Sequence, residues 1–181
     1  MHSGAVPVDP DLYFDLSMDE IREVTRFAAA AAQEAVDLLP DPVDGRIVAG
    51  LEAARRFAAG EPRSTLQRVT ALDAHRAAKD ACDLVAAHAA SASGDAAASA
   101  YLHPFAKADQ VGHILRSTAH AALAAEAATG DPSAARATLA RARARATPTL
   151  IAVLTRYPLA PRGHSRVTQL VSDLDRVLRE H

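Results

Sequence analysis

Residues 101–120 combine side chains and spacings that could support chemistry, because histidines and amides recur there at helical intervals. In an α-helix, side chains three or four positions apart lie on the same face. One such face carries Gln110, His113, Ser117 and His120. His103 lies seven residues before Gln110, although Pro104 is expected to disturb the helix between them. A polar stripe on a helix otherwise built from alanine and leucine indicates a buried hydrogen-bond network, a partner-binding surface or a metal site.

A metal site needs more ligands than this stripe alone brings together. His113 and His120 are two turns apart, about 10.5 Å along the helix axis, so one ion cannot bind both from a single helix. The four-residue histidine spacing of metalloproteases and the Glu-x-x-His pair of di-iron bundles do not occur here. A metal would therefore need His75, His88 or Asp73 from a neighbouring helix. We expect no metal and no cofactor, and we favour a buried network of hydrogen-bonded imidazoles.

A second group of charges occurs within residues 73–80, and it comprises Asp73, His75, Arg76 and Asp80. Arg76 has the helical spacing for an ion pair with either Asp73 or Asp80. These charges form either a solvated helix face or a seam that faces the histidine stripe or a partner. We expect no catalytic role, because Asp73 and His75 lie on different faces of one helix and no Cys–His or Ser–His signature is present.

The composition argues against several classes of protein. A formal charge of −2 is unlike that of a general polyanion binder. The arginines within residues 136–145 suit the end of a helix, where they meet the negative end of the dipole, with an acidic partner as the alternative. Nucleic acid is not an expected partner, because no aromatic residues are interleaved with them to stack bases. Cys82 is the single cysteine, which excludes an intrachain disulfide, and its alanine-rich surroundings predict a buried thiol.

Helices are predicted to position all of these residues. Roughly a quarter of the chain is alanine, the strongest helix former, and no segment alternates with the period of a strand. Capping boxes at residues 17–20 and 64–67 begin two helices, and the Gly-Asp-Pro sequence at 130–132 separates two others. The predicted helices cover residues 17–39, 44–59, 64–92, 95–128 with a break at His103-Pro104, 132–146, 147–156 and 165–181.

The expected fold is all-α, an irregular antiparallel bundle of about six to seven helices with alanine-rich packing. Alanine buries little area, so such helices must approach one another closely. Residues 1–16 are predicted to form a flexible N-terminal arm and residues 17–181 a single helical domain. No stretch approaches the roughly 20 apolar residues of a membrane span, and no secretory signal is present. We therefore expect a cytoplasmic protein with no membrane partner.

Several short motifs resemble a bacterial family of alanine-rich immunity proteins. They are Ala71–Ala78, Tyr101–Pro104, Gln110–Leu115 and Ala119–Ala122, followed by Arg156–Pro158 and Leu174-Asp175 near the C-terminus. The likeness extends from about residue 17 to the end of the sequence. Gly112 departs from the family's pattern, in which a long polar residue is expected at this position.

The resemblance implies a non-enzymatic cytosolic protein that binds and neutralises a toxin of a bacterial polymorphic-toxin system. The cognate toxin would be the protein partner, and a second copy of the chain in a homodimer is an alternative. The acidic residues between Asp9 and Glu20 would suit a basic toxin, or would simply favour a helix N-terminus. The competing hypothesis is a helical-bundle enzyme, or a small-molecule or metal-binding protein, that uses His75, His113 and His120.

Overall fold

The computed structural model describes residues 12–180, which contain eight α-helices and a 3-10 turn, η2, between the fourth and fifth helices. Their bounds are α1 Met18–Val36, α2 Gly45–Ala58, α3 Thr65–Asp80, α4 Leu84–Ala98, η2 Ser99–Tyr101, α5 Gln110–Thr129, α6 Pro132–Arg145, α7 Pro148–Leu154 and α8 Arg166–Arg179. The predicted all-α bundle is confirmed. Within residues 12–180 the β-type pairing is limited to one isolated bridge, between Tyr13 and Phe105.

Most of the predicted N-terminal arm, residues 1–11, lies outside the described residues. Residues 12–16 run beside the loop that follows η2. The N–H of Phe14 donates to the carbonyl of Pro104 over 3.2 Å, and the N–H of Ala106 donates to the carbonyl of Leu12 over 2.8 Å. This pairing holds the loop between η2 and α5 at one end of the bundle.

The helix termini follow the local signals of the sequence. Ser17 and Glu20 form the predicted capping box at the start of α1, and Ser64 and Gln67 form another at the start of α3. Each box satisfies backbone N–H groups that have no partner inside the helix. Gly130 ends α5 in the left-handed conformation, with φ of 69°, which glycine adopts without a steric penalty.

The chain between residues 64 and 98 departs from the prediction. A single helix was expected up to residue 92, but α3 ends at Asp80, and Asp83 begins α4 by accepting from the N–H of Ala86. Ser93-Gly94, the gap between the predicted helices 64–92 and 95–128, lies inside α4 instead. Cys82 lies in the connection between α3 and α4 and is exposed, so the predicted buried thiol is wrong.

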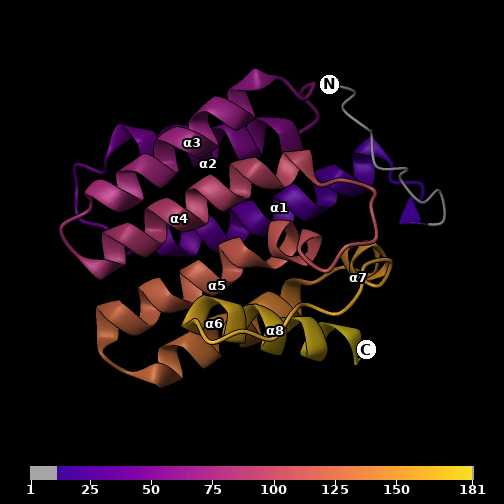
Figure 1. Cartoon of the computed structure of the whole chain (residues 1–181). Helices are drawn as coiled ribbons and strands as arrows, with labels where there is room; N and C mark the ends of the chain where they lie inside the picture. Colours follow the sequence, from indigo (N-terminus) through magenta and orange to yellow (C-terminus); the bar gives the residue numbers. More distant parts are fainter. Residues whose placement is uncertain (1–11, 181) are drawn as a thin grey trace, which may run out of the picture.

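Helix α4 lies between α3 and α5, with α1 and α2 packed against it from behind (Figure 1). Much of this contact is alanine against alanine, including Ala28, Ala32, Ala89 and Ala92, none of which has exposed surface. Larger side chains, among them Ile114 and Leu174, fill a second core toward α7 and α8. Close packing of small residues on α4 brings the helices on either side within reach of its polar groups.

Candidate functional site

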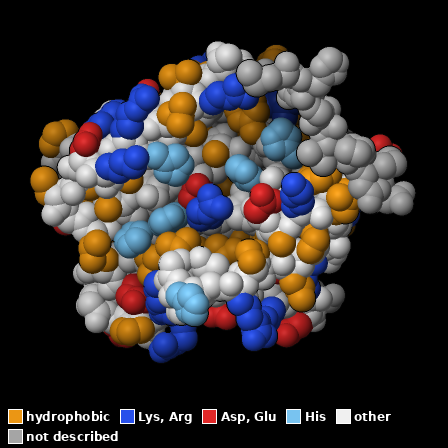
Figure 2. Space-filling model, in the orientation of Figure 1, with side chains coloured by type: hydrophobic (Ala, Val, Ile, Leu, Met, Phe, Trp, Pro, Cys, Tyr) orange, Lys and Arg blue, Asp and Glu red, His pale blue; other side chains and the backbone are white. Residues whose placement is uncertain are grey.

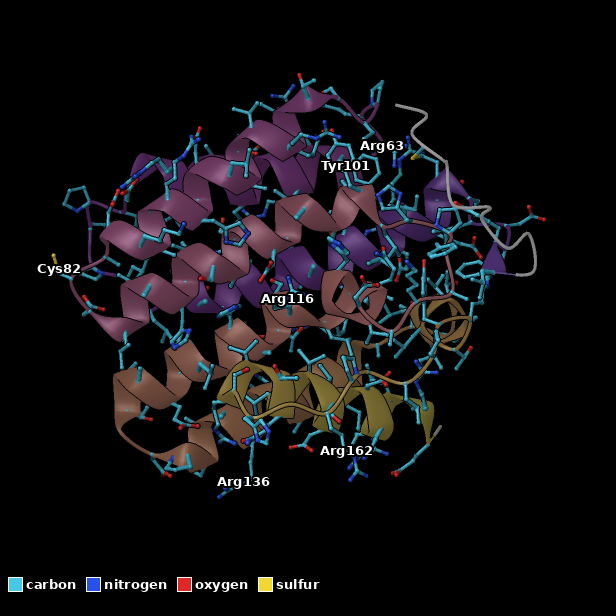
Figure 3. All side chains as sticks on the ribbon, in the orientation of Figure 1. Arg63, Cys82, Tyr101, Arg116, Arg136 and Arg162 are labelled. Atoms are coloured by element: carbon cyan, nitrogen blue, oxygen red, sulfur yellow. The ribbon has the colours of Figure 1, made fainter. Side chains whose placement is uncertain are left out.

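A buried carboxyl group, that of Asp95 on α4, lies at the centre of a polar cluster formed by three helices. Only 6% of its side chain is exposed. Its Oδ1 atom is 3.6 Å from Nε2 of His75 on α3 and 3.6 Å from Nη1 of Arg116 on α5. Its Oδ2 atom is 3.7 Å from Nε2 of His120, also on α5. In the view of Figure 3, Arg116 lies at the centre of the face, beside α4 and α5.

Two glycines make room for the basic groups around Asp95. A Cβ atom at Gly94 would lie 2.9 Å from both Cε1 and Nε2 of His75. A Cβ atom at Gly112 would lie 2.3 Å from Nη2 of Arg116, so the guanidinium folds back over the backbone of its own helix. Glycine inside a helix lowers helix stability by about 1 kcal/mol relative to alanine. At these two positions, the missing Cβ atom leaves space for two basic side chains.

The carboxyl group of Asp95 is poorly hydrogen-bonded for a buried group. All three basic neighbours are farther away than the usual hydrogen-bond length, and Oδ2 is buried without a hydrogen-bond partner. Burial raises the pKa of Asp95 to about 7, and the charge of Arg116 opposes that rise. Near neutral pH the group is therefore divided between its neutral and ionised forms.

The histidines of the cluster favour the neutral form. Burial lowers the pKa of His120 to about 3, and the neighbouring His88 and Arg116 lower it further. Burial also lowers the pKa of His75 and that of His113, with the charge of Arg116 as the next cause for both. The Nδ1 atoms of His88 and His120 are 3.0 Å apart. One of these nitrogens must donate and the other accept, which two neutral imidazoles can do.

The predicted stripe on α5 divides into residues of different roles. Ser117 is buried, with its hydroxyl 2.9 Å from the carbonyl of Ala28 and 2.8 Å from that of Ala92, so it links α5 to α1 and α4. Gln110 accepts from the N–H of His103 over 3.1 Å. Gln110 therefore fastens the loop before α5, where the exposed His103 lies.

The charged and histidine side chains of residues 73–80 also have different partners. Asp73 and Arg76 form the predicted ion pair over 2.7 Å at the surface of α3. Asp80 pairs instead with Arg46 of α2, also over 2.7 Å, and not with Arg76. Of this group, His75 is the residue that contacts the cluster around Asp95.

Sequence reasoning did not identify Asp95 or Arg116 as members of the site, and it considered His88 only as a possible metal ligand. Asp95 stood at the start of the predicted helix 95–128, because a helix break was expected at residues 93–94. The spacing nevertheless contained a signal, since Asp95 lies seven residues after His88 and Arg116 lies three residues after His113. The same periodicity that defined the histidine stripe therefore includes Arg116.

In the space-filling view, histidines gather across the middle of the molecular face, on either side of basic (blue) and acidic (red) side chains (Figure 2).

Within residues 12–180, no set of three or more histidine, cysteine, aspartate or glutamate side chains is arranged to hold a metal ion. Two arginines of α6, Arg141 and Arg145, are engaged elsewhere, because both pair with Glu34 of α1. In the same range, no helix has the length and apolar character that crossing a membrane requires.

Comparison with known protein families finds one whose model matches most of the helical bundle. Residues 15–149 match the family described as Imm-5 like putative immunity protein, and the chain belongs to this family. The matched segment holds every residue of the cluster around Asp95, whereas α8 lies beyond it. No curated protein and no solved structure matches the chain significantly.

Proposed function

We propose that this chain is a cytoplasmic, non-enzymatic immunity protein that binds a bacterial toxin and blocks its action. Membership of the Imm-5 like family over residues 15–149 is the observation that carries the proposal. Immunity proteins of this kind act by complementarity to their targets, so they need a rigid surface with fixed polar groups rather than a catalytic constellation.

The face around Asp95 supports this proposal as the binding surface. His75 and Arg116 are partly exposed, with 38% and 43% of their side chains accessible, and each is seated against a helix by a glycine. Side chains held in this way lose little freedom when a partner binds, which favours affinity. Residues 17–181 would act as one domain, because α5 packs against α1 and α4 on one side and against α6 and α8 on the other.

The proposal is tested by mixing the purified chain with the toxin domain encoded by the adjoining gene. Calorimetry should give a stoichiometric complex, and the toxin should lose its activity in that complex. A failure to bind any neighbouring toxin would overturn the proposal.

The competing hypothesis of a metal-binding or catalytic bundle is tested by elemental analysis of the same preparation. The immunity proposal expects no stoichiometric metal. Bound zinc, iron or manganese that disappears in a His113→Ala/His120→Ala double variant would instead favour the competing hypothesis.

A further inference from the structure

The positive charge of Arg116 is paired with Asp95, but only loosely. Its nearest paired carboxylate oxygen, Oδ1 of Asp95, is 3.6 Å away, beyond hydrogen-bond length. With a pKa of about 7, Asp95 carries only part of a negative charge near neutral pH. The Arg116 side chain is 43% exposed, so a solvent-accessible positive charge lies at the centre of the face in Figure 3.

The surroundings of Arg116 leave room for a small group. A cavity of about 170 Å³ lies between the start of α5 and α8, and Arg116, Gly112, Thr168 and Val171 are among the residues that line it. Asp109 is also part of this lining, and its carboxylate accepts from the side-chain amide of Gln110 over 3.5 Å. The wall that α8 contributes is largely apolar, which strengthens an ion pair formed against it.

We propose that Arg116 anchors a carboxylate-binding site, in which an acidic side chain of the partner protein lies against its guanidinium in the cavity between α5 and α8. This inference rests on the proposed function, because the partner is the toxin. Arginine presents paired N–H donors that match the two oxygens of a carboxylate. Arginine is also enriched among the few residues that dominate protein interfaces. Gly112 leaves the space in which the guanidinium lies.

The neighbouring titratable groups make the proposed binding depend on pH. A bound carboxylate would offset the charge of Arg116, which is the second cause, after burial, of the lowered pKa of His75 and of His113, so the pKa of each histidine would rise. The same anion would keep Asp95 protonated. All three changes make binding tighter as the pH falls from about 8 to about 6. The groups whose pKa responds to Arg116 are His75 on α3, Asp95 on α4, and His113 and His120 on α5. The charged and titratable groups that act on these four or on their neighbours are Lys79 on α3, His88 on α4, Asp109 and Glu126 on or beside α5, and His103 in the preceding loop.

The site is tested first with a blocked glutamate, N-acetylglutamate N-methylamide, followed by the NMR signals of the histidine rings. We expect saturable shifts that are larger at pH 6 than at pH 8, that are absent in Arg116→Gln and that persist in Arg136→Gln, a variant of an exposed arginine on α6. Blocked glutamine should cause no shift. The absence of saturable shifts in the wild type, or equal shifts in Arg116→Gln, would overturn the proposal. Tighter binding of inorganic phosphate than of the blocked glutamate would also overturn it, because the site would then suit phosphate.

The second test uses the complex with the neighbouring toxin. Arg116→Gln should weaken binding about tenfold or more, Arg116→Lys should weaken it less, and Arg136→Gln should leave it unchanged. If the wild type binds and Arg116→Gln binds equally well, the carboxylate site is wrong while the immunity function stands. If the wild type does not bind any neighbouring toxin, the immunity function fails, and the blocked-glutamate titration decides the site on its own. Thermal unfolding of each variant verifies that a loss of binding is not a loss of fold.

Discussion

The imidazole of His75 on α3 lies directly against Gly94 on α4, so closely that a Cβ atom at position 94 would be 2.9 Å from two atoms of the ring. Real Cβ contacts of this length essentially do not occur, so a side chain at this position would displace His75. The displacement would open the cluster around Asp95, because Nε2 of His75 is one of its three basic neighbours.

Replacing Gly94 with alanine should therefore destabilise the protein. Alanine would gain up to about 1 kcal/mol of helix propensity, but overpacking against His75 should cost about 1–3 kcal/mol. Urea unfolding measures the balance, and we expect a net loss of stability. Gly45→Ala is the matched control, since nothing lies within 4 Å of its Cβ position. That variant should be neutral or slightly stabilising, and an equal response at both positions would contradict the role of Gly94.

Asp95→Asn should stabilise the protein more at high pH than at low pH. The pKa of Asp95 rises from 3.8 in the unfolded chain to about 7 in the folded one, so the folded state binds the extra proton between these values. The stability that this carboxyl contributes is complete below pH 4 and is lost as the pH rises toward 7. The free energy of unfolding of Asp95→Asn minus that of the wild type, measured by urea unfolding, should therefore increase by about 2–4 kcal/mol from pH 4 to pH 8.

Asp73→Asn is the control for this measurement, because Asp73 pairs with Arg76 at the surface. Asp73→Asn should change the free energy of unfolding by no more than about 0.5 kcal/mol at every pH from 4 to 8, as expected for an exposed ion pair. If Asp95→Asn gave a difference from the wild type that did not change with pH, the buried environment assigned to Asp95 would be wrong.

His120→Gln should make the protein more resistant to acid. The pKa of His120 is lowered to about 3, so the unfolded chain binds a proton that the folded chain rejects between that value and 6.5. The wild type consequently loses stability as the pH falls below 6.5, and the variant should lose less between pH 7 and pH 5. The exposed His103→Gln is the control, and identical pH profiles for the two variants would refute this explanation.

The thiol of Cys82 should react with a thiol reagent in the native state about as fast as in the unfolded state. Cys82 is exposed in the short connection between α3 and α4, so access does not require unfolding. Absorbance after addition of an aromatic disulfide follows the reaction. Protection of the thiol until the protein unfolds would contradict this placement.

The sequence allowed prediction of the features that depend on local interactions. The capping box of Ser17 and Glu20 could be predicted because both residues lie within one helical turn. The break after α3 was not, because Asp83 could be recognised as the start of α4 only if the helix before it had already ended. The helix end expected near Gly94 was wrong for a related reason, since this glycine lies inside α4 and leaves room for His75 of a different helix.

The candidate site was predictable only in part, because its members converge through packing. The periodicity of α5 placed His113 and His120 on one stripe, and that expectation needed no tertiary information. The position of Asp95 opposite them depends on how closely α3, α4 and α5 approach. That approach is set by fully buried alanines such as Ala89 and Ala92, whose contacts a single sequence does not specify.

Growth under co-expression is the most direct test of our proposal that this chain protects a cell from a bacterial toxin. Cells that express the toxin domain from the adjoining gene should stop growing, and co-expression of this chain should restore growth. Arg136→Gln should protect as well as the wild type, whereas Arg116→Gln should protect less. Growth arrest that persists with every neighbouring toxin, despite abundant folded wild-type protein, would contradict the claim.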